Sequence, residues 1–274
     1  MLKTTLDIGG TITRGMAELK GKIYIVCVSV RAIIVFEAKS PYTRLPDIVV
    51  DKLIYAWDLA ACNINDCIYV SDKVVHCVWR ISIYGDVTMW IEGIQGEPTI
   101  SMMKGGNVLT CNESKLNIYA PSGSMLTSIN LPDELTEPLH AVSTIRQTFF
   151  VSHGTLCGIH RICEISKDGC ILRTYGRENG RGIGQLDSPY YMATDEEGRL
   201  FVWDVNMRIL LFDSELRLLR VLLSREDDRM DGGLRISYAR DSGNLLIGTF
   251  MGKGGVGMYH IRNGMKQARL SCEQ

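Results

Sequence analysis

The chain has 274 residues, of which 46% are hydrophobic and 22% are charged, and its formal net charge is -1. These values are typical of a globular protein, and the absence of a basic excess argues against DNA as a partner. No apolar run approaches the ~20 residues that span a bilayer, and the first residues lack the apolar stretch of a signal peptide. We therefore expect no membrane partner and a cytoplasmic location.

The nine cysteines are an odd number and have no compact framework spacing. Most lie in or beside strand-like runs, as do Cys27, Cys77, Cys111 and Cys163. We interpret them mainly as buried thiols of a protein in a reducing compartment, with a stray disulfide in a secreted protein as the weaker alternative.

In chain order, the first predicted strand is Thr4–Ile8, and a repeated phrase follows it. The easiest part of the phrase to align is a strand rich in β-branched and aromatic residues, found at 23–27, 68–72, 108–112, 149–153, 200–204 and 245–249. Successive copies begin 40–51 residues apart. A period of this length is the mark of a propeller or a solenoid.

Each copy has neighbours that also read as strands. A run with small residues precedes it, at 58–62, 99–103, 140–144, 191–195 and 235–239, with the start at 16–19 in the first repeat. A third strand and a more polar fourth strand follow, for example 77–81 and 87–91. We therefore predict an all-β fold, a six-bladed propeller of four-stranded antiparallel blades. A solenoid would have more uniform repeats and polar end caps.

We expect one domain over residues 1–274, with blades at about 15–50, 54–92, 96–131, 138–176, 185–223 and 233–263 plus 4–8. The ring must be closed by a strand from one end of the chain. We favour the N-terminal strand, because the first blade then begins naturally at Met16; the competing segment is 266–270.

The clearest copy of the phrase resembles the NHL repeat. Its matching residues are Gly184, Leu186, Pro189, Met192, Ala193, Asp195, Gly198, Phe201, Val202, Asp204, Arg208 and Ile209. The match is fair at Ile68–Ile81 and weak in the other repeats. As a whole the chain resembles NHL-type propeller proteins of invertebrates and the NHL domain of tripartite-motif ubiquitin ligases.

The resemblance implies a six-bladed propeller that serves as a binding platform for protein or RNA. The RING, B-box and coiled-coil segments of the ligases are not in this sequence, so the resemblance gives no basis for assigning a ligase role to this chain. Aromatic, cationic and polar side chains at the start of the innermost strands are the candidate contacts, namely Trp57, Asp58, His140, Tyr190, Tyr191 and Arg235. Such a composition is favoured at protein-binding surfaces.

Two other functions stay open. Related six-bladed folds include calcium-dependent lactonases and amidating lyases, and an Asp and a His on different blades would suit acid–base chemistry in a central channel. The Glu/Asn/Asp set that binds calcium is not visible at equivalent positions. Binding of single-stranded RNA would require a local basic patch.

Other motifs favour structural roles. His153, Cys157, His160 and Cys163 have a zinc-like spacing, but Cys163 is expected to alternate away from the loop, and the set Cys62, Cys67, His76 and Cys77 is spaced less well. Polar residues end the central strands, at Asp72 and Asp204 among others, where they suit turns. The glycine-rich segments 176–184 and 252–257 do not lead into helices, as phosphate loops do.

We predict no metal, no cofactor and no catalytic residue, hence a non-catalytic protein-interaction scaffold.

Overall fold

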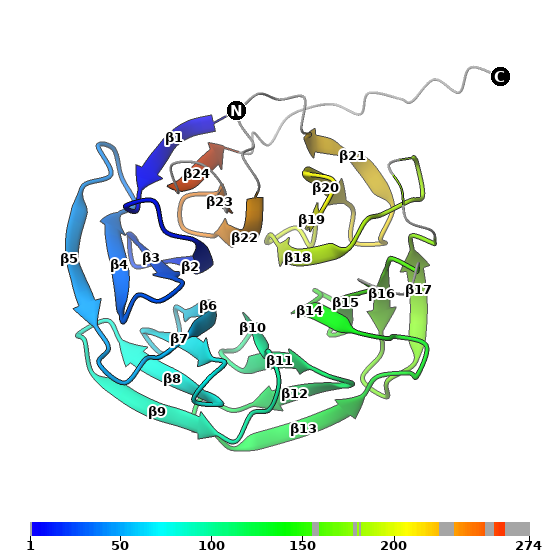
Figure 1. Cartoon of the computed structure of the whole chain (residues 1–274). Helices are drawn as coiled ribbons and strands as arrows, with labels where there is room; N and C mark the ends of the chain where they lie inside the picture. The colour runs from blue at the N-terminus through cyan, green and yellow to red at the C-terminus, as the bar shows by residue number, and fades with distance from the viewer. Residues whose placement is uncertain are drawn as a thin grey trace.

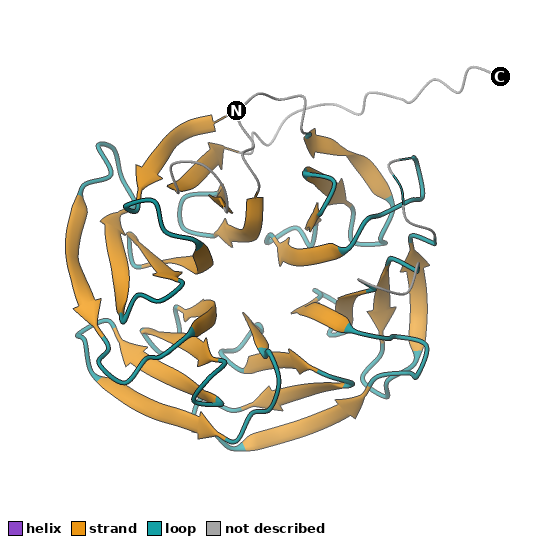
Figure 2. Cartoon of the chain, viewed as in Figure 1, coloured by secondary structure: helices purple, strands orange, loops and turns teal. Residues whose placement is uncertain are grey.

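The computed structural model describes residues 2–154, 159–177, 180, 182–224, 233–249 and 255–260. Their strands form six four-stranded antiparallel sheets arranged in a ring around a central channel (Figure 1). Figure 2 shows strands joined by loops, with no helix in the described part of the chain. The predicted all-β, six-bladed propeller is confirmed. No helix long and apolar enough to cross a membrane occurs among the described residues.

Each blade runs from an innermost to an outermost strand. Blade 1 has β2 (Thr13–Leu19), β3 (Lys22–Cys27), β4 (Ala32–Glu37) and β5 (Arg44–Val49). Blade 2 has β6 (Ala56–Cys62), β7 (Cys67–Asp72), β8 (Cys77–Ser82) and β9 (Val87–Glu92). Blade 3 has β10 (Thr99–Met102), β11 (Val108–Asn112), β12 (Lys115–Tyr119) and β13 (Met125–Asn130).

The other three blades follow the same order. Blade 4 has β14 (Pro138–Ser143), β15 (Phe149–His153), β16 (Arg161–Ile165) and β17 (Ile171–Tyr175). Blade 5 has β18 (Pro189–Thr194), β19 (Leu200–Asp204), β20 (Arg208–Phe212) and β21 (Leu218–Leu223). Blade 6 has β22 (Gly233–Ala239), β23 (Asn244–Thr249), β24 (Gly255–His260) and, as its outer strand, β1 (Leu2–Asp7).

The hydrophobic core lies between the blades. The second strands are nearly continuous apolar runs because both of their faces are covered, and β7 and β19 are buried along their whole length. Six clusters of buried residues result, and each joins two neighbouring blades. The outermost strands are more polar and more exposed, as in β13, where one residue in six is buried.

The ring is closed by the N-terminal strand, as predicted. β1 pairs antiparallel with β24, with Leu6 opposite Val256. Leu6 and Ile8 are buried in the cluster that joins blade 6 to blade 1. The alternative closing segment, 266–270, lies outside the described residues.

The inner strands begin earlier than we expected from the sequence. β14 starts at Pro138 and β18 at Pro189, each two residues before the predicted start. The reason is a β-bulge near the start of the strand, which leaves one residue unpaired with the second strand. The same irregularity occurs in β2, β6 and β22. A bulge interrupts the alternation of side chains, which is why the sequence pattern shows only the regular part of each strand.

The two faces of the ring carry different loops. The first face, here called the b–c face, carries the loops between second and third strands, such as 73–76, and the loops between blades; it is turned to the viewer in Figure 1. The opposite face, the a–b face, carries the loops between first and second strands, such as 144–148. All six innermost strands run from the b–c face to the a–b face.

Candidate functional site

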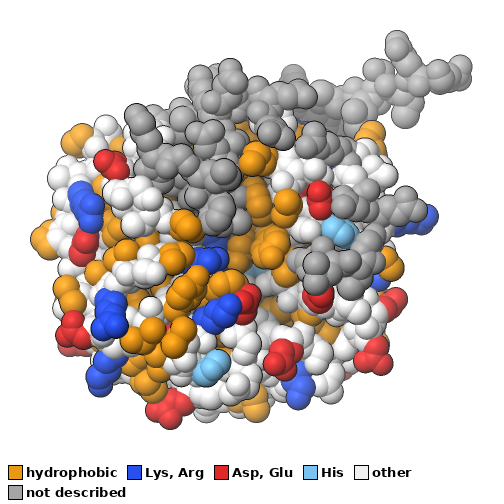
Figure 3. Space-filling view, in the orientation of Figure 1, with side chains coloured by type: hydrophobic (Ala, Val, Ile, Leu, Met, Phe, Trp, Pro, Cys, Tyr) orange, Lys and Arg blue, Asp and Glu red, His pale blue; other side chains and the backbone are white. Residues whose placement is uncertain are grey.

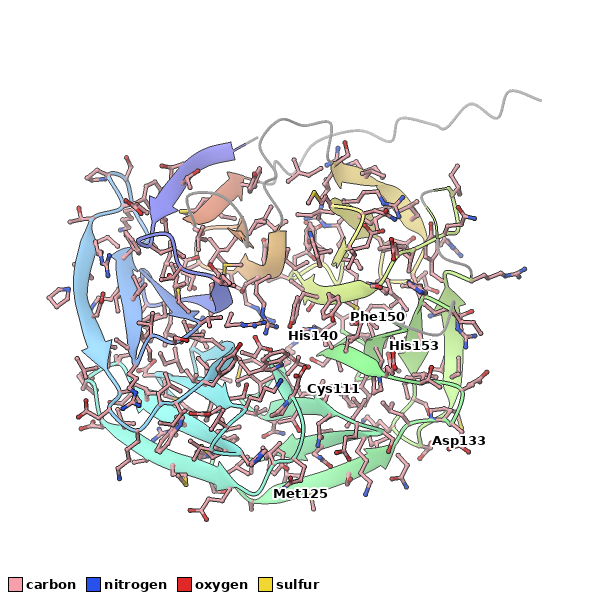
Figure 4. All side chains as sticks on the ribbon, viewed as in Figure 1. Cys111, Met125, Asp133, His140, Phe150 and His153 are labelled. Carbon is pink, nitrogen blue, oxygen red and sulfur yellow. The ribbon has the colours of Figure 1, made fainter. Side chains whose placement is uncertain are left out.

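Six equivalent positions surround the channel, one for each blade. Each lies on an innermost strand opposite the second-to-last residue of the second strand, and the six residues are Gly15, Asp58, Thr99, His140, Tyr191 and Arg235. We call this set the channel ring. Four of the six residues that the sequence suggested as contacts belong to it, and Figure 4 shows His140 at the channel, on β14.

Asp58 of blade 2 lies close to two other members of the channel ring, Arg235 and His140. Its Oδ1 lies 3.6 Å from Arg235 Nη1 of blade 6, an ion pair too long for a hydrogen bond. Its Oδ2 lies 3.9 Å from His140 Nε2 of blade 4. The blade between 6 and 2 contributes Gly15, which has no side chain to stand between Arg235 and Asp58.

Tyr191 of blade 5 completes the contacts across the ring. The guanidinium carbon of Arg235 lies 3.5 Å from the centre of the Tyr191 ring, a cation–π contact. The rings of Tyr191 and His140 meet edge to face, with their centres 5.4 Å apart. Arg235 also donates a hydrogen bond from Nη2 to the carbonyl oxygen of Trp57. Side chains from four blades therefore meet across the channel at this level.

Burial controls the protonation of two residues of the channel ring, Asp58 and His140. Desolvation raises the pKa of the Asp58 carboxyl, while Arg235 and the backbone N–H groups of Ile100 and Leu59 oppose the rise. Desolvation and the nearby Arg235 charge lower the pKa of His140 to about 3. His140 is therefore a neutral imidazole at pH 7.

A second group of side chains lies on the b–c face beside Arg235. Arg14 lies with its guanidinium carbon 4.6 Å from the ring centre of Trp57 and 5.6 Å from that of Tyr55, and Arg14 Nη2 donates to Tyr55 Oη at 2.9 Å. Lys73 Nζ lies 4.8 Å from the Trp57 ring centre and forms an ion pair with Glu97. We call Arg14, Tyr55, Trp57 and Lys73 the Trp57 cluster. In Figure 3, hydrophobic side chains and Lys or Arg gather around the middle of this face.

The remaining candidate, Tyr190, lies beside Tyr191 at the bulge of β18. Its ring centre is 5.8 Å from that of Tyr191 and 6.3 Å from that of Trp203. Tyr190 and Trp57 are both half-buried, and they occupy the unpaired bulge positions of their strands. The six residues suggested by the sequence thus lie at two levels, with Trp57 and Tyr190 at the unpaired positions beside the channel ring.

A cavity of about 130 Å³ lies in the channel. Asp58, His140, Tyr191 and Arg235 line it, whereas Trp57 and Tyr190 do not. Its lining also includes Glu18, Asn63, Thr194 and Arg240, which lie at the a–b ends of innermost strands or just beyond them. The cavity therefore extends from the channel ring toward the a–b face.

The three described residues of the zinc-like motif, His153, His160 and Cys163, do not converge on one point. His160 is turned toward another blade, where its Nδ1 accepts a hydrogen bond of 2.5 Å from the Ser188 backbone N–H. Cys163, which we expected to point away from the loop, has its Sγ 3.6 Å from His153 Nε2, because the two residues lie on paired strands, two positions apart. Cys157 lies outside the described residues. Among the residues described, no group of three or more His, Cys, Asp or Glu side chains is placed to hold a metal ion.

Polar residues at the ends of the second strands have structural partners, as expected. Asp72 accepts backbone N–H bonds from Ile54, Tyr55, Val74 and Val75, and it thereby fixes the loop that carries Lys73 and the segment that leads into β6 of the same blade. Asp204 is bound by the guanidinium of Arg208 and also by backbone N–H groups. These carboxylates position the loops of the b–c face.

No protein-family model and no curated protein matches the sequence. The fold is similar to solved propellers. A gluconolactonase from Xanthomonas campestris gives a TM-score of 0.69 at 13% identity over 93% of this chain and 88% of that one. A streptogramin B lyase gives 0.64 at 11% identity over 95% and 87%. A chain of a nidogen/laminin complex gives 0.63 at 12% identity over 80% and 82%. At these identities the likeness establishes the propeller fold.

Proposed function

We propose that this chain is a non-catalytic interaction module that binds a protein partner on its b–c face, at the mouth of the channel. The observation that carries the proposal is the Trp57 cluster, where two aromatic rings and two cations from blades 1 and 2 lie together beside Arg235. Tryptophan, tyrosine and arginine are the residues that most often dominate the energy of protein interfaces. The closed ring holds them on a rigid scaffold.

We also propose that the module is of the NHL type. The support is the phrase in blade 5, whose Asp204 and Arg208 form a buried ion pair that joins the end of β19 to the start of β20. The family resemblance would account for the binding face, since NHL propellers serve as platforms for protein or RNA.

Affinity capture from the native cell tests the proposal. We expect the wild-type chain to retain a protein that the double variant Trp57→Ala/Tyr190→Ala does not retain, because the variant removes aromatic surface from two sides of the channel mouth. The matched control is Tyr84→Ala, which removes an aromatic ring that is 85% exposed on the a–b face. Quantitative mass spectrometry of the captured proteins gives the readout.

One outcome of the capture experiment would contradict the proposal. If the double variant captures the same partners in the same amounts as the wild type and the control, the b–c face is not the binding surface. Circular dichroism of each variant establishes that the ring is still folded, so that a loss of partner is not a loss of structure.

A second candidate function is a hydrolase or lyase reaction in the channel. The observation that favours it is the 130 Å³ cavity, which is lined by the buried carboxyl of Asp58 and the neutral imidazole of His140. A neutral imidazole is the form that accepts a proton from a substrate, although a pKa of about 3 makes His140 a weak base at pH 7. Incubation with a panel of lactones, together with elemental analysis of the purified protein, tests it; His140→Gln should abolish any turnover that is found.

Binding of single-stranded RNA receives less support from the geometry. RNA-binding platforms offer free aromatic faces on which bases stack. The Trp57 ring instead has three cations within 6 Å of its centre, from Arg14, Lys73 and Arg235. Two of these cations also lie close to carboxylates, those of Glu97 and Asp58.

A further inference from the structure

The side chains around Trp57 are rich in hydrogen-bond donors that have no acceptor. Buried Nε of Arg14, Nε1 of Trp57 and Nη1 of Arg235 form no hydrogen bond to the described residues. A buried donor without an acceptor is costly, so native proteins rarely leave several together. Here the three donors belong to Trp57 and to the two arginines that lie against its ring.

The two carboxylates beside the cluster, those of Asp58 and Glu97, already have partners. Asp58 Oδ1 accepts the Leu59 N–H and Oδ2 accepts the Ile100 N–H, each at 2.9 Å. Glu97 is bound to Lys73. Arg14 forms no ion pair with any carboxylate in the described part of the chain; its hydrogen bond goes to the neutral hydroxyl of Tyr55. The cluster and Arg235 together hold three cations beside two carboxylates, and Arg14 is the cation left without one.

We infer that the Trp57 cluster binds the carboxylate of an acidic side chain, Asp or Glu, in an acidic segment of the protein partner. Arg14 supplies the charge and the planar donor edge that suits a carboxylate. Tyr55 and Trp57 hold the guanidinium by stacking, and the indole N–H of Trp57 is a second donor without an acceptor. This inference names the ligand chemistry of the proposed binding face and rests on that proposed function.

Phosphate-bearing RNA is the other anionic polymer to consider, and the arrangement favours the peptide. An RNA strand is held by a track of cations along its backbone together with free aromatic faces. Arg14 alone lacks a carboxylate neighbour in the cluster, and cations already lie against the Trp57 ring. A single acidic side chain needs only one such cation.

Fluorescence anisotropy with a labelled hexaglutamate peptide, blocked at both ends, tests the inference. Hexaglutamine of the same length is the uncharged probe, and hexauridylate is the RNA probe. We expect wild-type protein to bind hexaglutamate at least about tenfold more tightly than either of them, with affinity that falls as salt is raised.

Variants locate the binding. Arg14→Gln should weaken hexaglutamate binding at least about tenfold. Trp57→Phe keeps an aromatic ring but removes the indole N–H, and it should weaken binding by a smaller factor. The matched control is Arg240→Gln, which removes an equal charge from an exposed residue near the a–b face and should leave binding unchanged.

Three results overturn the inference: no binding of hexaglutamate up to about 1 mM, equal weakening by Arg14→Gln and Arg240→Gln, or tighter binding of hexauridylate that Arg14→Gln abolishes. These failures are separate from failure of the proposed function. If Trp57→Ala/Tyr190→Ala loses the captured partner but hexaglutamate does not bind, the interaction face stands and its acidic ligand is wrong.

Discussion

His140 shows how one buried residue of the channel sets a property of the whole protein. The imidazole is buried beside Arg235, so protonation would put a second positive charge in a poorly solvated position with no well-aligned carboxylate to stabilise it. In the unfolded chain the same imidazole is free to bind a proton. Folding is therefore coupled to the pH through this residue.

We predict that the protein loses stability in mild acid through His140. Its pKa falls from 6.5 in the unfolded chain to about 3 in the folded one. The unfolded state thus binds a proton between these values and the folded state does not, so stability is complete above pH 6.5 and falls as the pH falls. Between pH 7 and pH 5 the loss is about 2 kcal/mol. Urea unfolding at a series of pH values measures it.

Two histidine variants distinguish the contribution of His140 from other sources of acid sensitivity. His140→Gln should remove about half of the slope between pH 7 and pH 5, while exposed His76→Gln should leave it intact. A slope of similar size should remain from His153, whose pKa is also lowered by burial, to about 4, which is still below this pH range. An unchanged slope in His140→Gln would show that the imidazole titrates normally in the folded protein.

The residues of the candidate site were predictable only in part. Trp57, Asp58, His140, Tyr190, Tyr191 and Arg235 stood out because they begin recognisable inner strands. Arg14 was missed because the first inner strand was predicted to begin at Met16, whereas β2 begins at Thr13. If Gly15 had been aligned with Asp58 and Tyr191 as the equivalent position of the repeat, Arg14 would have fallen at the position that Trp57 and Tyr190 occupy in their blades. Lys73 comes from a loop, where no periodic pattern marks a side chain.

At the scale of strands and loops, Glu164 on β16 joins blades 4 and 5. The carboxylate is fully buried and accepts hydrogen bonds from Thr148 Oγ1 at 2.6 Å, Arg146 Nη2 at 2.9 Å and Arg173 Nη1 at 2.7 Å. Both arginines also bind Glu215 in the next blade. Although burial acts to raise the pKa of Glu164, these hydrogen bonds together hold it below the usual value.

We predict that Glu164→Gln lowers the free energy of unfolding by about 2 kcal/mol at pH 7, since it leaves two arginines facing a neutral amide. Because the pKa of Glu164 is lowered on folding, its contribution is present above the unfolded value of 4.5 and is lost as the pH falls below it. The difference between variant and wild type should therefore shrink in acid. Glu215→Gln, at a carboxylate that is 37% exposed, should cost less than about 1 kcal/mol.

Prediction from sequence succeeded for strand elements with continuous apolar runs. β7 and β19 are buried on both faces, so almost every residue carries the pattern. It was weaker at strand ends: the apolar pattern of the fourth strand in blade 5 already begins at Leu216, but β21 begins at Leu218, because the turn takes Leu216 into a positive φ of 61°. Such a conformation depends on the turn and leaves no periodic trace.

At the scale of the whole molecule, stability depends on six apolar interfaces that close on themselves. We predict that Leu6→Ala costs about 3 kcal/mol, because Leu6 is buried in the interface that β1 completes between blades 6 and 1. Leu126→Ala on the outer strand of blade 3, where the side chain is 54% exposed, should cost less than about 1 kcal/mol. Chemical denaturation of both variants gives the comparison, and equal costs would mean that the closing strand contributes no core.

The pairing of β1 with β24 also has a consequence for biosynthesis. Leu6 and Val256 are adjacent in the sheet but are separated by 250 positions along the chain. During translation β1 leaves the ribosome before the rest of the propeller, so it must remain without its partner until almost all of the propeller has been made. The apolar side chains of Leu6 and Ile8 stay exposed to water throughout that interval. The nascent chain therefore carries an unpaired apolar strand, which chaperones would be expected to shield.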